Sequence, residues 1–357
     1  MQLPPSISRS WFSMAGFLKL FTDDSAAAQP AQPTIGLALS HGAARGLAHI
    51  GVIQVLEEEK IPISVIAGSS MGAYVGALWA SGVEGPGLAK LAAEIKDRRT
   101  LIGLLDPIFP PMTGIVRGHK IRKHLGKTLG ELNTEQLQRK LLVVATNLDT
   151  GKGEILRNVP LAQAVHASCA IPGICAPVNI GEFNYIDGGA AEPMPVRLLK
   201  RIEKVDYVIG VNVMPTPEDM LQCHYDGFPI PPKPVLGMWK RAMRGLNRSI
   251  NLFAYGNVLD TYMRCLNAAQ MRILDEDATQ ADVLLHPYFC ESKWYDFENF
   301  DRYIIAGRDA AKAALPQIRA LLKSHPKSLN HETVPLITPV GCRDPRVLAP
   351  LAISPAA

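Results

Sequence analysis

Short apolar runs alternate with longer amphipathic stretches over residues 34–213. The runs predicted to be buried strands are TIGLAL (34–39), ISVIAG (63–68), KLLVVATNLDTG (140–151), EFNYIDGG (182–189) and VDYVIGVNV (205–213). Helical periodicity fills several of the intervals, at about residues 45–59, 70–82, 160–173 and 195–203. A helix between consecutive strands is a crossover that makes the strands parallel. The pattern therefore predicts an α/β fold with a mainly parallel central sheet.

The pattern changes after Val213. A Pro-rich stretch (214–236) precedes a helical region (237–275), a further short strand in ADVLLHP (281–287) and a closing helix (300–323). We therefore expect an N-terminal tail and linker (1–33), a catalytic-type domain (34–215), a mostly helical extension packed on it (216–324) and a disordered tail (325–357). The apolar segment WFSMAGFLKLF in the first tail has two open interpretations, an amphipathic helix on a membrane surface or a frayed end.

Composition narrows the classes of function. The 357 residues are 47% hydrophobic and 20% charged, which is typical of a globular protein, and the formal net charge is +4. This mild basicity favours anionic partners such as phospholipid surfaces. The sequence lacks the basic stripe interleaved with aromatic residues that would indicate a nucleic-acid partner, so we expect none. The sequence has no run of 18 apolar residues, so we expect no membrane span.

Six cysteines are scattered along the chain, and no two form a CxxC pair. This usage predicts free thiols in a reducing compartment and no zinc site. Cys223 and His224 are a candidate ligand pair, but no second pair accompanies them. We therefore expect no metal.

The motif GSSMG (68–72) is the strongest chemical signal. It fits G-x-S-x-G and lies between a predicted buried strand and a predicted helix, which is the context that the motif requires. A sharp turn there projects the central hydroxyl from the end of the sheet, and Gly68 and Gly72 let strand and helix approach. Ser70 is therefore the candidate nucleophile, and Ser69 is the off-centre alternative.

A serine nucleophile needs a base, and His286 is the histidine whose position best suits that role. His286, in LLHP after a predicted strand, would suit a Ser-His-Asp hydrolase. Asp187 ends the strand of YIDGG, where an acid either caps the turn or points into a site at the carboxyl end of the sheet. Gly188 and Gly189 after it allow a backbone or a substrate to come close.

The turn SHGAARG (40–46) follows the first predicted strand. It could bind phosphate, form an oxyanion loop or serve only as a turn. A dinucleotide site would need G-x-G-x-x-G and an acid at the end of the next strand, and neither is present. No GK[ST] follows the loop either. This argues against the phosphate-binding interpretation.

Taken in order, SHGAARG, GSSMG, LLVVATNLDTG, AVHASCAIPGICAPV and YIDGGAAEPMPV resemble the bacterial patatin-like phospholipase family (PNPLA domain). The resemblance is strong over about residues 34–215 and weak toward 320. It implies a three-layer α/β/α fold and a serine acyl hydrolase of the phospholipase A or lysophospholipase type. It further implies a Ser70–Asp187 dyad without histidine, a phospholipid or other acyl-ester lipid as substrate, and no metal or organic cofactor.

The resemblance also implies roles for the glycine-dotted segments. The backbone N–H groups of Gly42, Ala43 and Ala44 would form the oxyanion hole, and Arg45 would anchor their loop. The supporting motif positions are Gly46, Gly68, Gly72, Gly188 and Gly189. His41 and Ala43 stand where the family usually has glycine, so the geometry of this loop is an open question.

Two alternatives to the dyad hydrolase remain open at this stage. One is a patatin-like scaffold that binds lipid or protein partners without turnover, and the other is a Ser-His-Asp esterase of the α/β-hydrolase type. The resemblance and the thiols together predict a cytoplasmic protein with a peripheral contact at the inner membrane.

Overall fold

The computed structural model describes residues 33–95, 98–110, 112–225 and 257–324. The apolar N-terminal segment, most of the predicted helical region at 237–275 and the predicted tail at 325–357 lie outside these ranges. The prediction of a helix beginning at about 237 is therefore testable only from residue 257 onward.

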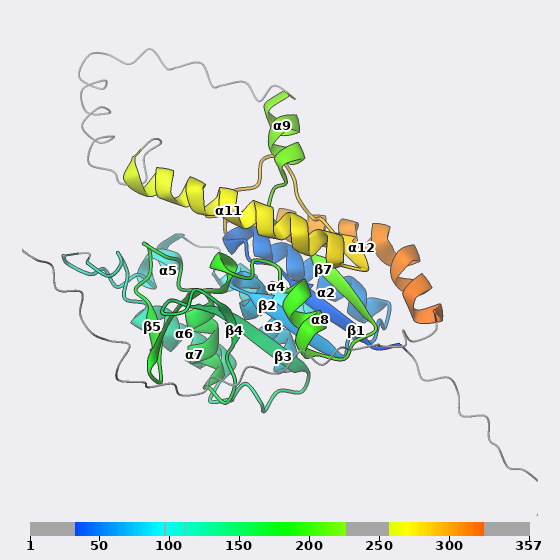
Figure 1. The fold of residues 1–357 in the computed structure, drawn as a ribbon, viewed down its shortest axis with the longest axis horizontal. Coiled ribbons are helices and arrows are strands. Elements are labelled where there is room, and N and C mark those ends of the chain that lie inside the picture. Colours follow the sequence, from blue (N-terminus) through cyan, green and yellow to red (C-terminus); the bar gives the residue numbers. More distant parts are fainter. Residues whose placement is uncertain (1–32, 96–97, 111, 226–256, 325–357) are drawn as a thin grey trace, which may run out of the picture. The chain divides into compact units, whose positions relative to one another are not determined.

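One eight-stranded sheet organises the described residues (Figure 1). Its strand order is β5-β6-β3-β2-β1-β7-β8, and β4 pairs with β3. The strands are β1 (Ile35–Leu39), β2 (Val65–Ser69), β3 (Lys140–Asn147), β4 (Gly153–Ile155), β5 (Val178–Ile180), β6 (Phe183–Asp187), β7 (Tyr207–Val211) and β8 (Val283–Leu285). Strands β3, β2, β1, β7 and β8 run parallel, whereas β4, β5 and β6 add antiparallel pairs at one edge. The predicted sheet is confirmed as mixed and mainly parallel.

Alternate side chains of the parallel strands enter different cores. On β1, Leu37 and Leu39 join the larger core, whereas Ala38 between them joins the smaller one. The same alternation holds on β3, where Val143 faces the larger core and Leu142 the smaller. Successive side chains of a strand point to opposite faces, so both faces of this sheet are covered. The structure therefore has three layers, as predicted.

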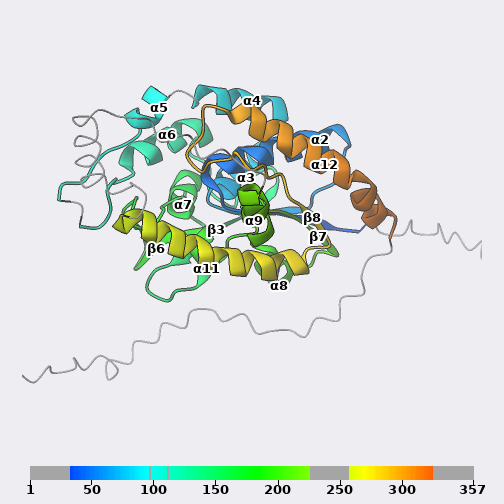
Figure 2. The same cartoon turned by 90° about the horizontal axis from the view of Figure 1, so that it is seen from above.

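Helices supply the two outer layers (Figure 2). Helices α2 (Ala48–Glu58), α3 (Met71–Ala80), α7 (Leu161–Ser168) and α12 (Phe300–Lys323) contribute to the larger core. Helices α8 (Val196–Ile202) and α11 (Val258–Gln280) contribute to the smaller core. The remaining elements are the 3-10 turns η1 (Ala43–Leu47) and η2 (Gly188–Ala190) and the helices α4 (Gly85–Glu94), α5 (Arg98–Gly103), α6 (His119–Leu129) and α9 (Pro217–Tyr225).

The predicted extension beyond residue 215 contributes to the sheet itself. Strand β8 pairs in parallel with β7, with Ile209 opposite Val283. Helix α12 has the predicted bounds 300–323 and packs against α2, with Gly307 and Gly51 at the close approach. A division between a domain and an extension near residue 215 stays a prediction. No helix in the described ranges is long and apolar enough to cross a membrane.

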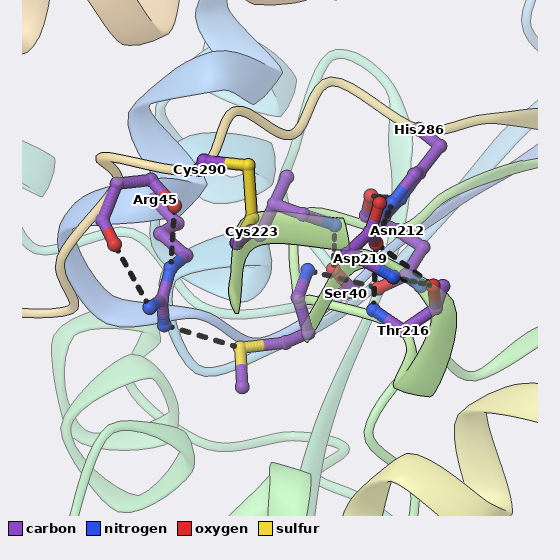
Figure 3. Close-up of polar contacts among 11 residues, drawn as sticks. Ser40, Arg45, Asn212, Thr216, Asp219, Cys223, His286 and Cys290 are labelled. Carbon is purple, nitrogen blue, oxygen red and sulfur yellow. Dashed lines mark hydrogen bonds and ion pairs between the residues drawn. A yellow bond between two sulfur atoms is a disulfide. The ribbon is translucent and has the colours of Figure 1, made fainter. Parts of the chain in front are cut away.

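One prediction about the cysteines is wrong. Cys223 on α9 and Cys290 after β8 form a disulfide across a sequence separation of 67 residues (Figure 3). Cys169, Cys175 and Cys265 are free thiols. The pairing depends on how α9 packs near the end of β8, which residue spacing does not encode. The argument from thiols to a reducing compartment therefore loses its basis.

Candidate active site

Ser70 occupies a sharp turn between β2 and α3. Its backbone angles are φ 54° and ψ −122°, a region that a residue with a side chain rarely adopts. A Cβ at Gly72 would lie 2.3 Å from the Leu39 carbonyl oxygen, and one at Gly68 would lie 2.6 Å from the backbone of Gly72. Only glycine permits these approaches, so the motif holds Ser70 in its strained geometry.

Asp187 lies at the end of β6, directly beside Ser70. The Ser70 hydroxyl donates a hydrogen bond of 2.6 Å to Asp187 Oδ2, and the Gly189 N–H donates to Oδ1 at 2.7 Å. The Asp187 side chain is buried, and burial raises its pKa from 3.8 to about 6, although the two hydrogen bonds oppose the shift. At neutral pH this carboxyl is therefore mostly ionised and yet close to the pKa that suits a general base.

Ser168, at the end of α7, ties the turn to the sheet. Its hydroxyl accepts the Ser70 N–H at 2.9 Å and donates to the Val144 carbonyl at 2.5 Å. Thr146 on β3 likewise donates its hydroxyl to the Asp187 carbonyl at 2.9 Å. Both residues lie in blocks that carry the family resemblance, Ser168 in AVHASCAIPGICAPV and Thr146 in LLVVATNLDTG, but the sequence did not predict their roles. Ser168 therefore links the Ser70 backbone to Val144 on β3, and Thr146 on β3 binds the Asp187 backbone.

The loop after β1 differs from the prediction at one position. Among the described residues, no acceptor binds the N–H of Gly42 or Ala43, but the Ala44 N–H donates to the Trp294 carbonyl at 2.9 Å. Ala44 is therefore not available as an oxyanion donor, and that part of the prediction is wrong. Ala43 has a φ of +47°, a left-handed conformation that costs an alanine ~1 kcal/mol.

Arg45 fixes this loop to the segment that follows β8 (Figure 3). Its Nε donates to the Ser292 hydroxyl and its Nη2 to the Ser292 carbonyl, each at 3.1 Å. Gly46 packs on Met71, because a Cβ there would lie 2.4 Å from the Met71 side chain. The same segment that takes the Ala44 N–H thus also holds the Arg45 guanidinium.

The Gly188-Gly189 turn is closely packed as well. A Cβ at Gly188 would lie 2.3 Å from the Val144 carbonyl oxygen, and one at Gly189 would lie 2.7 Å from the His41 ring. The His41 side chain is buried, and burial, with a contribution from Arg45, lowers its pKa to about 4. His41 is therefore neutral at pH 7. Gln270 on α11 donates to the Gly189 carbonyl at 2.8 Å and so connects this turn to the outer helix.

His286, the alternative base, is engaged elsewhere (Figure 3). Its Nδ1 lies 2.9 Å from the Asn212 carbonyl oxygen, and its Nε2 lies 2.7 Å from Asp219 Oδ2. Both ring nitrogens therefore have partners, and within the described part of the chain neither is hydrogen-bonded to Ser70. The structure brings Ser70 together with Asp187 and keeps His286 apart from this pair.

Sequence reasoning also missed one backbone donor. Met71 is the first residue of α3, and the first N–H groups of a helix have no acceptor within it. The signal was available, because the motif places this residue directly after Ser70.

For a metal, the described residues offer no group of three or more His, Cys, Asp or Glu side chains placed to hold an ion. A strained serine hydroxyl against a buried carboxylate is equipped for nucleophilic attack on a carbonyl.

Comparison with known proteins agrees with this arrangement. Residues 37–200 match the family described as Patatin-like phospholipase. NTE family proteins of Mycobacterium bovis and Mycobacterium tuberculosis are 40% identical over 183 residues, which is 51% of this chain and 49% of theirs. Lysophospholipase NTE1 of Pyricularia oryzae is 30% identical over 195 residues, 54% of this chain and 13% of its own length.

Among solved structures, VipD from Legionella pneumophila is similar over 83% of this chain and 67% of that chain, with 16% identity and a TM-score of 0.40.

The three-layer α/β fold thus places a strained serine, Ser70, at the turn between β2 and α3. Residues 37–200, which contain Ser70 and Asp187, match the patatin-like phospholipase family as a domain within the chain. The chain spans about half the length of the mycobacterial relatives that it matches.

Proposed function

We propose that the protein is a serine acyl hydrolase that cleaves carboxylic esters of lipids. The observation that carries this proposal is the 2.6 Å hydrogen bond from the strained Ser70 to the buried Asp187. The match of residues 37–200 to the patatin-like phospholipase family supports lipid esters as the substrate class. The relative named Lysophospholipase NTE1 supports phospholipids or lysophospholipids among them.

The chemistry needs no third residue. Ser70 Oγ attacks the ester carbonyl carbon while its proton passes to Asp187 Oδ2 along the existing hydrogen bond. Asp187 then gives this proton to the departing alcohol oxygen, which leaves an acyl group on Ser70. Water attacks the acyl-enzyme and yields its proton to Asp187. The fatty acid departs as the proton returns to Ser70 Oγ.

The negative charge that develops on the carbonyl oxygen needs preorganised donors. We assign this role to the N–H groups of Gly42 and Ala43, which no acceptor within the described residues engages. The Met71 N–H at the start of α3 is a third donor, and the positive end of the helix dipole adds to it. The contacts of Arg45 with Ser292 keep the Gly42–Ala43 backbone in place.

The pH dependence of fatty-acid release tests this proposal. The full chain, given phospholipid or lysophospholipid micelles, is expected to release fatty acid at a rate that rises as pH increases through about 6. The base must be ionised, and burial has raised the pKa of Asp187 from 3.8 to about 6, so activity falls below that pH. An exposed aspartate would lose activity only near pH 4.

A control separates Asp187 from a nearby buried carboxyl. Burial, with a contribution from Asp277, raises the pKa of Glu192 to about 7. The Glu192→Gln variant is expected to keep the inflection near pH 6. Loss of the inflection in that variant, or an inflection near pH 4 in the wild type, would contradict Asp187 as base. Absence of fatty-acid release from every lipid ester would instead favour a binding scaffold.

A further inference from the structure

Helices α5 and α6 and the loop between them carry an unusual concentration of positive charge. Residues 98–127 contain one acidic residue, Asp106, and the basic residues Arg98, Arg99, Arg117, Lys120, Arg122, Lys123 and Lys127. Asp106 accepts the N–H groups of Gly118 and His119 at the start of α6, so its charge is directed to the helix N-terminus. Asp106 forms no ion pair with Arg117, Arg122, Lys123 or Lys127.

Most of these cations point to solvent. Arg117, Arg122, Lys123 and Lys127 are exposed, and none forms an ion pair with another described residue. Elsewhere on the described surface, exposed arginines such as Arg302 and Arg319 pair with glutamates. We name the exposed Arg122, Lys123 and Lys127, which have no ion-pair partner among the described residues, the cationic face of α6.

Exposed apolar side chains stand beside this charge. Phe109 is 94% exposed and Met112 83%, both at the tip of the loop between α5 and α6, and Ile102 and Leu105 are 55% and 44% exposed. Large apolar residues at such exposure are unfavourable in water unless a partner covers them. We name Ile102, Leu105, Phe109 and Met112 the apolar tip.

This surface borders the candidate active site. The Ile115 N–H donates to the Ile174 carbonyl and the Ala176 N–H to the Val116 carbonyl, each at 2.9 Å, so the end of the loop lies against residues 174–176. The pKa of the Cys175 thiol is raised to about 11 by burial first, and the carboxylates of both Asp187 and Asp106 contribute. The Asp187 N–H donates to the Ala170 carbonyl and the Cys175 N–H to the Ile171 carbonyl, each at 2.8 Å, so residues 170–176 connect the end of the loop to Asp187.

We propose that the apolar tip and the cationic face of α6 dock the protein on an anionic phospholipid bilayer. Apolar side chains that insert at the interface, flanked by Lys and Arg that face anionic head groups, are what such a surface requires. The bilayer is favoured over a protein partner because the charge is almost entirely of one sign. The proposal rests on the proposed function, since docking here would bring lipid next to Ser70 and Asp187.

Vesicle binding tests the docking surface without relying on catalysis. The full chain with Ser70→Ala, which leaves the lipid intact, is titrated with vesicles of phosphatidylcholine alone or mixed with phosphatidylglycerol. Binding is expected to be stronger to the anionic vesicles and to weaken with salt. Lys123→Gln with Lys127→Gln should lower the partition coefficient by at least about tenfold, and Phe109→Ser with Met112→Ser should do the same.

Matched variants on other faces provide the controls. Lys90→Gln with Lys323→Gln removes two exposed charges from α4 and α12, and Met220→Ser with Leu221→Ser removes two exposed apolar side chains from α9. These pairs should bind vesicles like the parent. Equal losses in test and control pairs, or tip variants that bind like the parent, would overturn the proposal.

Hydrolysis is measured separately, in chains that retain Ser70. A water-soluble short-chain ester should be cleaved by the α6 and tip variants at a rate within about twofold of the wild type, because no bilayer is involved. Vesicle binding with the expected pattern but no ester cleavage would leave docking supported and the hydrolase proposal contradicted. Ester cleavage with unchanged vesicle binding in the variants would support the hydrolase proposal and contradict the docking proposal.

Discussion

The Ser70→Ala variant is expected to lose at least about a thousandfold in kcat/KM for ester hydrolysis, with its fold intact. The substitution removes the attacking oxygen and also the hydrogen bond to Asp187. What activity remains would come from the oxyanion donors and substrate binding alone. Initial rates of fatty-acid release, compared at equal concentrations of folded protein, give the ratio.

Ser69→Ala is the matched control for this prediction. It makes the same chemical change one residue earlier, where the Ser69 hydroxyl donates to the Glu192 carbonyl at 2.5 Å instead of to Asp187. We expect it to keep activity within about tenfold, because the loss of one buried hydrogen bond costs on the order of 1 kcal/mol. If the Ser69→Ala protein were inactive and the Ser70→Ala protein active, Ser69 would be the nucleophile and the proposal would be contradicted.

Gly307→Ala is expected to destabilise the protein by about 3 kcal/mol. Gly307 lies in α12 where this helix crosses α2, and a Cβ added there would lie 1.9 Å from the Ala48 carbonyl oxygen. Gly51 on α2 makes the reciprocal approach, with the Ile304 carbonyl oxygen 2.0 Å from the position of an added Cβ. The two helices must separate to accept the methyl group, so their packing is lost over several turns. A lower urea midpoint with an unchanged slope is the expected measurement.

Gly126→Ala is the control for the helix crossing. Gly126 lies inside α6, and an added Cβ there meets no atom within 4 Å. Alanine is the better helix former by up to about 1 kcal/mol, so this variant should be as stable as the wild type or more so. A Gly307→Ala protein that unfolds at the wild-type urea concentration would contradict the close crossing of α2 and α12.

The sequence predicted the features that depend on local pattern. The apolar run before GSSMG and the helical periodicity after it place Ser70 at a turn, and the same reasoning places Asp187 at the end of β6. Strand bounds came out a residue or more too long at several ends, because apolar residues such as Val213 continue past the last ladder position of β7. Local pattern does not show where the hydrogen-bonded register stops.

The remaining features of the site depend on segments distant in sequence. The sequence predicted Ala44 as an oxyanion donor, but in the folded chain its N–H donates to the carbonyl of the distant Trp294. Ser168 lies in the block AVHASCAIPGICAPV, but nothing in that block shows that its hydroxyl accepts the Ser70 N–H. Cys223 and Cys290 looked like free thiols because nothing in their spacing shows that α9 and the segment after β8 come together. Which backbone groups stay free is therefore a property of the packed chain.

The identity of the base is tested most directly by comparing kcat/KM for Asp187→Asn and His286→Gln on the same lipid ester. Asp187→Asn keeps the shape of the side chain but cannot take the Ser70 proton, so a loss of at least about a thousandfold is expected. His286→Gln should stay within about tenfold of the wild type, because His286 contacts Asn212 and Asp219. An active Asp187→Asn beside an inactive, folded His286→Gln would contradict the Ser70–Asp187 dyad.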